Sequence, residues 1–211
     1  MNPRDPSTTQ QMVERCVALI LLVAVSPLLL LISIAIFIEC GRPVFFKQTR
    51  VGRYGQPFRL WKFRTMRAGA VGAAITFGRD SRTTHVGRFL RKYKLDELPQ
   101  LWNVVRAGMN FVGPRPEVPK FVDLSDPGWR SAMKVRPGIT SPASIAYRNE
   151  ESLLGGVTDP VQYYIDTVVP SKLAIDLAYL ENRSFLTDFE VIAKTFRCAF
   201  FPRHTEDCHR R

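Results

Sequence analysis

The chain has 211 residues, 45% of them hydrophobic, and carries a formal net charge of +11 at pH 7. This length fits one domain and excludes a chain of several large domains. The basic charge indicates a polyanionic partner such as nucleic acid, anionic lipid or a phosphorylated substrate. The 4 cysteines form no C-x-x-C pair, which argues against a disulfide framework and fits a reducing compartment.

An uncharged apolar run, Val17 to Ile38, is the first predicted element. A helix over these 22 residues would reach about 33 Å, enough for a bilayer core of roughly 30 Å. The alternatives are a buried helix of a soluble protein and a signal peptide. Uncharged runs of this length are rare in soluble helices, and the run is too long for a signal peptide and lacks its cleavage site. Membrane insertion is therefore favoured.

The dipeptide Ser26-Pro27 lies near the middle of this run. Proline lacks a backbone N–H and its ring clashes with the carbonyl four residues earlier, so we expect a kink near Val23 to Ser26. The Ser26 hydroxyl can satisfy the freed carbonyl. The kink leaves two topologies open, a bent transmembrane helix and a re-entrant hairpin. The basic residues that follow place the remaining chain on the cytoplasmic side: Arg42, Lys47, Arg50 and Arg53.

A hairpin, a loop and a helix are predicted next. Residues 43–63 contain two apolar and aromatic segments around Gly52 and Gly55, which predicts a short β-hairpin. Residues 68–81 are small and glycine-rich, which predicts a loop. From His85 to Lys94, apolar side chains recur at i, i+3, i+4 and i+7 among basic ones. This pattern predicts an amphipathic helix suited to a core face or to an anionic membrane surface.

Asp96 and Glu97 are adjacent carboxylates in the most basic part of the chain. Residues 41–100 contain 14 Lys and Arg against 3 Asp and Glu, so their local excess equals the +11 of the whole chain. Opposite charge is expected to keep both carboxylates ionised. Asp96 is also a good N-cap for a helix through Val105 that stops at Gly108, and this cap is the simpler interpretation. An ionised Asp among phosphate-binding groups is alternatively a nucleophile or a metal ligand.

Two proline-containing turns, Gly113–Pro116 and Arg136–Gly138, each present one guanidinium on a stiff backbone. Arginine binds phosphate oxygens in bidentate fashion, although solvated turn arginines are common. A strand is expected from Ile139 to Ala146. The chain from Asp159 onward predicts three helices, which are assigned to packing: one over about 161–169, one from Pro170 and one from about Asp188.

Taken in order, four motifs resemble those of the bacterial sugar transferase family, the small monotopic phosphoglycosyl transferases. The resemblance covers roughly residues 13–196. The motifs are Lys62-Phe63-Arg64-Thr65-Met66, the segment from Leu95 to Val104 around Asp96-Glu97, Val112-Gly113-Pro114-Arg115-Pro116, and Arg136-Pro137-Gly138-Ile139-Thr140.

The resemblance implies an α+β fold, mostly helical. Residues 1–40 would carry a re-entrant membrane helix at about 17–38, broken at Ser26-Pro27. Residues 41–211 would form a cytoplasmic, membrane-associated catalytic domain with a small β-hairpin and amphipathic interfacial helices. The implied reaction moves a phosphosugar from a UDP-sugar to undecaprenyl phosphate, through an aspartyl-phosphosugar intermediate, with Mg²⁺ as cofactor and UMP as leaving group. It would be the first membrane step of glycoconjugate assembly (exopolysaccharide, O-antigen, capsule or glycoprotein) at the bacterial inner membrane.

By position, the resemblance makes Asp96 the nucleophile and Glu97 a magnesium ligand or positioning group, with both residues in the metal site. The candidate phosphate-binding residues are Arg91, Arg115, Lys62 and Arg64, with Arg136 and Arg148 as weaker candidates for the nucleotide or the lipid phosphate. This chemistry is consistent with the residues, because a carboxylate attacks a dianionic diphosphate only when cations neutralise the phosphates. Covalent catalysis then splits the transfer into two in-line displacements.

The chain departs from the family pattern around Glu14, Gly108 and Ser144, which puts sugar and nucleotide selectivity in question more than the reaction. The expected partners are a UDP-sugar, undecaprenyl phosphate and anionic membrane lipid, with a homodimer as an open alternative and no nucleic acid. A membrane-anchored nucleic-acid-binding protein lacks a supporting motif. A non-catalytic scaffold is disfavoured because Asp96, Glu97 and Arg115 are all intact.

Overall fold

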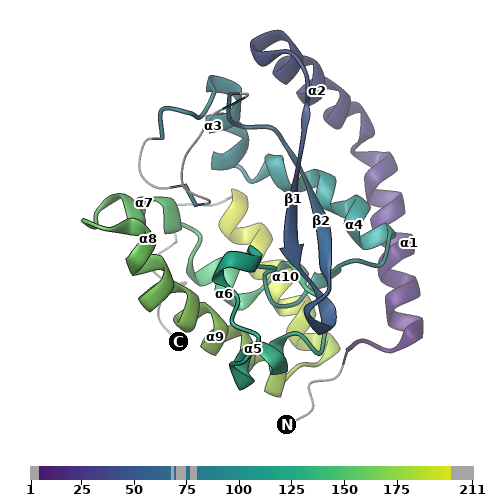
Figure 1. Ribbon diagram of the computed structural model, residues 1–211. Coiled ribbons are helices and arrows are strands. Elements are labelled where there is room, and N and C mark those ends of the chain that lie inside the picture. The colour runs from purple at the N-terminus through teal and green to yellow at the C-terminus, as the bar shows by residue number, and fades with distance from the viewer. Residues whose placement is uncertain (1–4, 68, 70–74, 77–79, 201–211) are drawn as a thin grey trace.

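The computed structural model describes residues 5–67, 69, 75–76 and 80–200. Most of these residues are helical, and the strands form two sheets of 2 strands each (Figure 1). The predicted fold class is confirmed in this respect. Most of the loop predicted at 68–81 lies outside the described residues, as does the tail from His204 onward.

The N-terminal apolar run forms two helices, α1 (Thr8–Ala24) and α2 (Ser26–Cys40), which meet at a bend of 58°. As predicted, the break lies at Ser26-Pro27, and the Ser26 hydroxyl donates to the carbonyl of Val23 at 2.8 Å. The predicted start at Val17 is wrong, because Ser7 and Gln10 form a capping box that begins the helix at Thr8. Among the described residues no single helix has the length and apolar composition to cross a membrane, whereas the bent pair together does.

Carboxylates fix both ends of this helix pair to the rest of the chain. Before α1, Asp5 pairs with Arg136 at 2.9 Å and with Arg53 at 3.2 Å. Near the end of α2, Glu39 accepts hydrogen bonds from the backbone N–H groups of His85 and Val86, which start α3 (His85–Lys92). The pair is therefore anchored at two separate places.

The predicted hairpin is confirmed as strands β1 (Phe45–Val51) and β2 (Pro57–Phe63), with the short helix η1 (Arg53–Gly55) at the turn. The strands are antiparallel, with Gln48 opposite Leu60 and Arg50 opposite Phe58. Side chains that lie opposite each other in such a pair share one face. Lys62, opposite Phe46, therefore lies on the same face as Gln48 and Arg50.

The Asp96 segment differs from its prediction. Residues Leu95–Gln100 form a 3₁₀ helix, η2, and only Leu101–Val105 form an α-helix, α4. Asp96 is not the N-cap, because it lies inside the first turn after Lys94, whose backbone is left-handed. The tight turn suits Pro99, which has no N–H for an α-helical bond. The left-handed residue that follows α4 is Ala107 rather than Gly108.

Two short parallel strands, β3 (Asn110–Val112) and β4 (Gly138–Thr140), bring the two arginine turns together. Their approach is very close, since a Cβ atom on Gly138 would lie 2.1 Å from the backbone nitrogen of Gly113. The predicted strand over 139–146 ends early. Ser141 caps a new helix, α6 (Pro142–Ala146), by accepting from the Ser144 N–H at 3.0 Å, and Pro142 starts it.

The remaining helices pack around this centre. As predicted, a new α-helix starts close to Pro170, which occupies the first turn of α9. The segment before it is not one α-helix, because a π-helical stretch joins α8 to α9 without a gap. The last helix begins before Asp188. The bounds are η3 (Pro119–Phe121), α5 (Pro127–Ala132), α7 (Glu150–Gly155), α8 (Pro160–Tyr163), η4 (Tyr164–Val168), α9 (Val169–Glu181) and α10 (Phe185–Phe200).

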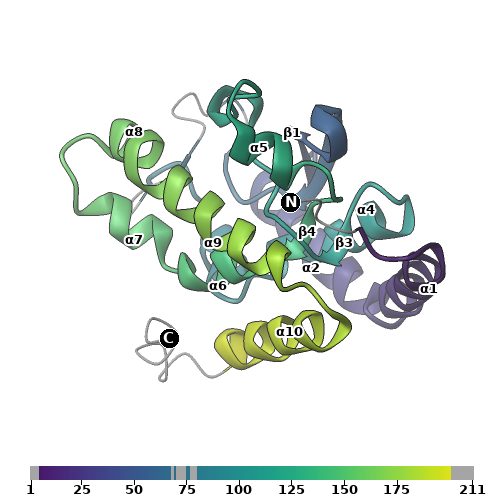
Figure 2. The ribbon, with the colours of Figure 1, turned by 90° about the horizontal axis from the view of Figure 1, so that it is seen from below.

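Buried side chains form several clusters. One, which includes Trp129, Leu154 and Val168, joins α5, α7 and the α8–α9 stretch. Another joins Ala18 of α1 to Leu60 of the hairpin and Val104 of α4. In the view of Figure 2, β3 and β4 lie near the middle of the molecule, and both α1 and α10 contact β3.

Candidate active site

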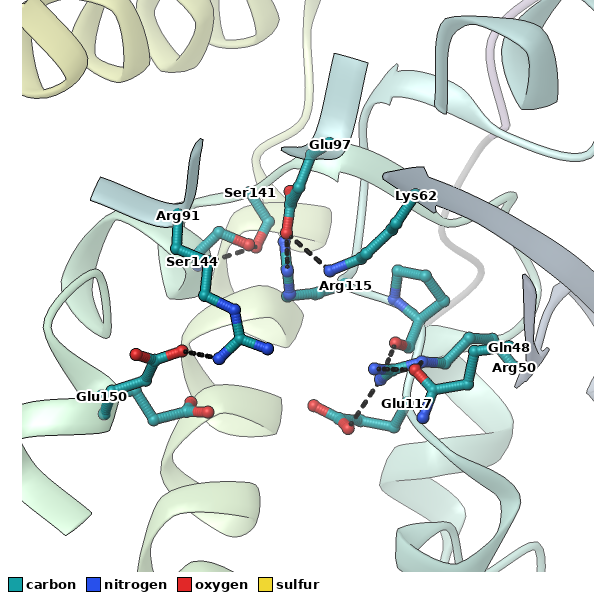
Figure 3. Close-up of polar contacts among 12 residues, drawn as sticks. Gln48, Arg50, Lys62, Arg91, Glu97, Arg115, Glu117, Ser141, Ser144 and Glu150 are labelled. Carbon is teal, nitrogen blue, oxygen red and sulfur yellow. Dashed lines mark hydrogen bonds and ion pairs between the residues drawn. The ribbon is translucent and has the colours of Figure 1, made fainter. Parts of the chain in front are cut away.

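Glu97 is the centre of a cluster of charged side chains (Figure 3). Its Oε1 atom lies 2.8 Å from the Lys62 ammonium and 2.5 Å from Nη2 of Arg115, and its Oε2 atom lies 3.3 Å from Nη1 of Arg115. Burial by itself would raise the pKa of Glu97, but Arg115 and Lys62 together hold that pKa well below its usual range. The carboxylate of Glu97 is therefore ionised, and each of its oxygens has a cationic partner.

Asp96 precedes Glu97 but has different surroundings. The residue is only 7% exposed, and its Oδ1 atom has no hydrogen-bond partner among the described residues. Burial raises the pKa of Asp96, and the charge of Lys62 opposes this rise only in part. Basic neighbours thus lower the pKa of Glu97 as expected, whereas at Asp96 burial outweighs the cations and the pKa is raised.

Arg91 lies at the edge of the same cavity as these carboxylates. Its Nε donates to the Thr65 hydroxyl at 2.9 Å, and its Nη1 lies 3.0 Å from Glu151 of α7. The Glu151 side chain is 51% exposed, so this ion pair is open to solvent and should be weak. A phosphate can therefore replace Glu151 at Arg91 with little loss.

Arg64 is almost fully buried beside the end of α2. Its Nη2 atom donates to the carbonyls of Cys40 and Gly41, both at 2.8 Å. Its Nε and Nη1 atoms have no hydrogen-bond partner within the described part of the chain. The guanidinium thus fixes α2 with one nitrogen and keeps two buried donors unpaired, in a residue that lines the cavity.

The other two arginine candidates lie apart from each other. Arg148 lines the cavity together with Lys62, Arg64, Arg91 and Arg115. Arg136 instead pairs with Asp5 and donates through Nε to the carbonyl of Ala107. Five of the six cationic candidates thus border one space, and Arg136 contributes to the anchor of the N-terminal segment.

A second buried cluster next to Glu97 was not predicted from the sequence. Glu117 accepts from the Tyr164 hydroxyl at 2.9 Å and pairs with Arg50 at 3.4 Å and Lys172 at 3.6 Å. Lys172 also pairs with Glu150. The alternation of the hairpin could have placed Arg50 on the face of Lys62, but nothing in the helical pattern of α9 distinguishes Lys172 from a surface lysine.

Asp176 of α9 fixes the backbone that carries Arg115. Its two carboxylate oxygens accept from the N–H groups of Arg115 at 3.3 Å and Ala143 at 3.1 Å. Burial raises the pKa of Asp176 to about 6, although these hydrogen bonds act in the opposite direction. This residue holds the Gly113–Pro116 turn against the start of α6.

The cluster opens into a cavity of about 1920 Å³. This is about twice the upper end of the usual range of roughly 300–1,000 Å³ for a small-molecule site, so it has room for two substrates. One part is lined by charged side chains, and another part by apolar side chains. The charged part includes Arg50, Lys62, Arg64, Arg91, Asp96, Glu97, Arg115, Glu117, Arg148 and Lys172.

The carboxylate of Asp96 fits a metal ion whose other ligands come mostly from the substrate. Among the described residues no group of three or more His, Cys, Asp or Glu side chains could hold a metal ion. Mg²⁺ usually binds through one or two carboxylates together with substrate phosphates and water. The unbonded Oδ1 of Asp96 is such a donor, whereas the oxygens of Glu97 are already held by cations.

Comparison with known proteins identifies the family of this chain. Residues 6–202 match the family model described as "Bacterial sugar transferase". The chain belongs to the bacterial sugar transferase family. It is therefore a transferase, as the sequence motifs predicted.

Several curated relatives of the transferase carry more specific names. It is 35% identical over 181 residues to "Uncharacterized sugar transferase EpsL" of Bacillus subtilis (strain 168), covering 85% of this chain and 82% of the relative. It is 36% identical over 199 residues to the "UDP-glucose:undecaprenyl-phosphate glucose-1-phosphate transferase" of Caulobacter vibrioides, covering 92% of this chain and 70% of the relative. An Aeromonas hydrophila relative, "UDP-N-acetylgalactosamine-undecaprenyl-phosphate N-acetylgalactosaminephosphotransferase", is 37% identical over 82% of this chain and 39% of its own length. The named donor sugar differs between the last two relatives.

Proposed function

We propose that the transferase moves a phosphosugar from a UDP-sugar to undecaprenyl phosphate through a covalent intermediate on Asp96. The observation that carries the proposal is the contrast within the carboxylate pair. Glu97 is saturated by Lys62 and Arg115, whereas Asp96 has an unbonded oxygen at a cationic cavity. The names of the relatives support the two substrates.

In the first step, Oδ1 of Asp96 attacks the phosphorus atom that bears the sugar. The bond from this phosphorus to the bridging oxygen breaks, and UMP leaves with that oxygen. In the second step, a phosphate oxygen of undecaprenyl phosphate attacks the same phosphorus, and the carboxylate of Asp96 is released. The product is undecaprenyl diphosphate sugar, and each step is an in-line displacement.

The neighbouring residues position charge for both steps. Glu97 holds the ammonium of Lys62 and the planar guanidinium of Arg115 beside Asp96, where the diphosphate must lie for attack. Groups that are already oriented stabilise developing charge without reorganisation. Arg91 can exchange Glu151 for a phosphate, and Arg64, which lines the same cavity, has two buried donors without a hydrogen-bond partner among the described residues.

We propose Mg²⁺ as cofactor, with Asp96 as its protein ligand and substrate phosphates as further ligands. Bound there, the ion would neutralise the diphosphate and so favour attack by a carboxylate. Glu97 acts through its cations rather than as a ligand. Equilibrium dialysis should show weak Mg²⁺ binding without UDP-sugar and stronger binding with it, and Asp96→Asn should remove the difference. Equal binding with and without the UDP-sugar would contradict this assignment.

We place the active site at the cytoplasmic face of the bacterial inner membrane, with α1 and α2 as a re-entrant hairpin. The reaction would then be the first membrane step of glycoconjugate assembly. The basic helix α3 supports contact with anionic lipid, because Phe89 is 57% exposed beside basic residues. A homodimer stays a prediction from the sequence.

The test combines mass spectrometry with turnover. The wild-type protein, incubated with a UDP-sugar and no lipid acceptor, should gain the mass of one phosphosugar and release UMP. Asp96→Asn should do neither. Asp123→Asn, at a solvent-exposed acid outside the cavity, is the control and should behave as wild type. A screen of UDP-sugars with undecaprenyl phosphate then identifies the donor. Turnover by Asp96→Asn would refute the assignment.

A further inference from the structure

The cavity does not end at the charged cluster. Its lining also includes a set of apolar side chains, named here the apolar groove: Val17 and Leu21 of α1, Leu101 of α4, Phe111 of β3, Ile139 of β4 and Ile192 of α10. Leu101, Phe111 and Ile139 belong to one hydrophobic cluster, and Phe111 and Ile192 belong to another. The β3–β4 pair contacts α10, and β3 also contacts α1. In Figure 2, α1 lies to the right of these strands and α10 lies below them. One continuous space is thus cationic in one part and apolar in another.

This combination selects an amphiphile with an anionic head and an apolar tail. A nucleotide sugar is polar along its whole length and would leave the apolar part unfilled. Lipid phosphates match both parts, because the phosphate can lie among the cations while hydrocarbon covers the groove. The cavity volume of about 1920 Å³ also leaves space for such a molecule beside a nucleotide sugar.

We infer that the apolar groove between α1 and α10 holds the first isoprene units of undecaprenyl phosphate, with its phosphate directed toward Asp96. This inference rests on the proposed function for the identity of the acceptor. It assigns an acceptor-binding role to α1 and α10, neither of which contributes a charged residue to the Glu97 cluster.

Two features of the walls support this occupant. The α10 wall is fixed to the floor, since the Thr195 hydroxyl lies 2.7 Å from that of Thr140, which follows Ile139 in β4. The apolar surface also continues outward along α10, because Phe196 is 61% exposed and Phe189 is 64% exposed. A long chain leaving the groove therefore passes along apolar side chains instead of charged ones.

Photo-crosslinking tests the groove without requiring turnover. The full-length protein carries p-benzoylphenylalanine in place of Leu21, which lines the groove, or of Ile20, the next residue on α1, which does not line it. Each variant is placed in phosphatidylglycerol liposomes that contain a small mole fraction of undecaprenyl phosphate. Position 21 should label undecaprenyl phosphate well above its mole fraction, and position 20 in proportion to it. Equal labelling at the two positions would overturn the inference.

A kinetic comparison tests the same groove during the reaction. Leu21→Trp should raise the KM for undecaprenyl phosphate about tenfold relative to Ile20→Trp, because the indole occupies space that the chain needs. Formation of the Asp96 phosphosugar from UDP-sugar alone is measured in both variants as the internal reference. An unchanged acceptor KM contradicts the inference. A wild-type protein that forms no phosphosugar refutes the proposed function instead, and the crosslinking result still decides the groove.

Discussion

The carboxylates of Asp96 and Glu97 are one residue apart and have different roles because their partners differ. Arg115 and Lys62 contact Glu97 and lower its pKa. The pKa of Asp96 is raised by burial and also by the negative charge of Glu97. Pairs of titratable groups with pKa values pushed apart are typical of acid, base and nucleophile assignments. The raised pKa of Asp96 also makes its carboxylate a better nucleophile once it is ionised.

This division predicts shifts of opposite sign in the pH dependence of phosphosugar formation. Asp96 must be ionised to attack, so the rate should fall as the pH drops through its raised pKa. Lys62→Met removes a charge that lowers the pKa of Asp96, so the acid limb should move to higher pH. Glu97→Gln removes a charge that raises it, so the limb should move to lower pH. The measurement is the initial rate with UDP-sugar alone from pH 4 to 8, and a limb that stays in place in both variants contradicts the assignment.

At the scale of elements, the β3–β4 pair sets the position of the Arg115 turn. Gly113 and Gly138 approach each other so closely that neither has space for a side chain. Because this pair also carries Phe111 and Ile139, it supports the charged cluster and the floor of the apolar groove together. A substitution in this strand pair should therefore affect the binding of both substrates.

Gly138→Ala tests this close packing. The added Cβ would lie 2.1 Å from the Gly113 nitrogen, so a backbone shift is required, and we expect a loss of about 1–3 kcal/mol in stability. Gly156→Ala is the control, since its Cβ would lie 3.6 Å from the nearest atom, the carbonyl oxygen of Leu153. Thermal unfolding in detergent measures both variants. An equal melting temperature for the two would contradict the predicted role of the pair.

Asp176 links α9 to the same turn and predicts a pH-dependent stability. Its pKa is about 6 in the folded protein against an ordinary value of 3.8, so the folded state retains a proton that the unfolded chain has lost. This contribution is fully present below about pH 4 and disappears as the pH rises through about 6, and it corresponds to about 3 kcal/mol. The free energy of unfolding is measured from pH 4 to 7 for wild type and for Asp176→Asn. Plotted against pH, it should fall more steeply for wild type across this window. Parallel curves would contradict the prediction.

The sequence predicted the elements that depend on local chemistry. The hairpin follows from its alternating side chains around two glycines, and the bend follows from a proline without an N–H. The cationic candidates other than Arg136 line one cavity, and their phosphate-binding role stays a prediction. Lys172 and Asp176 were missed because they reach Glu117 and Arg115 only through the packing of α9, more than 50 residues away. Helical periodicity identified α9 as a packing element, but it did not show which of its polar side chains face inward.

At the scale of the whole molecule, the proposed re-entrant arrangement of α1 and α2, which meet at a bend of 58°, predicts where the chain termini lie. A re-entrant hairpin places both termini on the cytoplasmic side. Single cysteines in an N-terminal tag and in a C-terminal tag, each in a cysteine-free variant, should be protected alike from an impermeant reagent in intact cells. Leu124→Cys, which is exposed in the remaining part of the chain, marks the side of the active site. Labelling of the N-terminal tag alone would demonstrate a spanning helix.

The two carboxylates that anchor the helix pair also order events during synthesis. Glu39 needs the backbone of His85, 46 residues later, and Asp5 needs Arg136, 131 residues later. At roughly 5–20 residues per second, the ribosome reaches Arg136 some 7–26 s after Asp5. From the synthesis of Cys40 onward, which is most of this interval, α1 and α2 are already made while the partners of Asp5 are incomplete. In the proposed re-entrant arrangement, delivery of the nascent chain to lipid therefore depends on the helix pair alone, and the contacts of Asp5 with Arg136 form only afterwards.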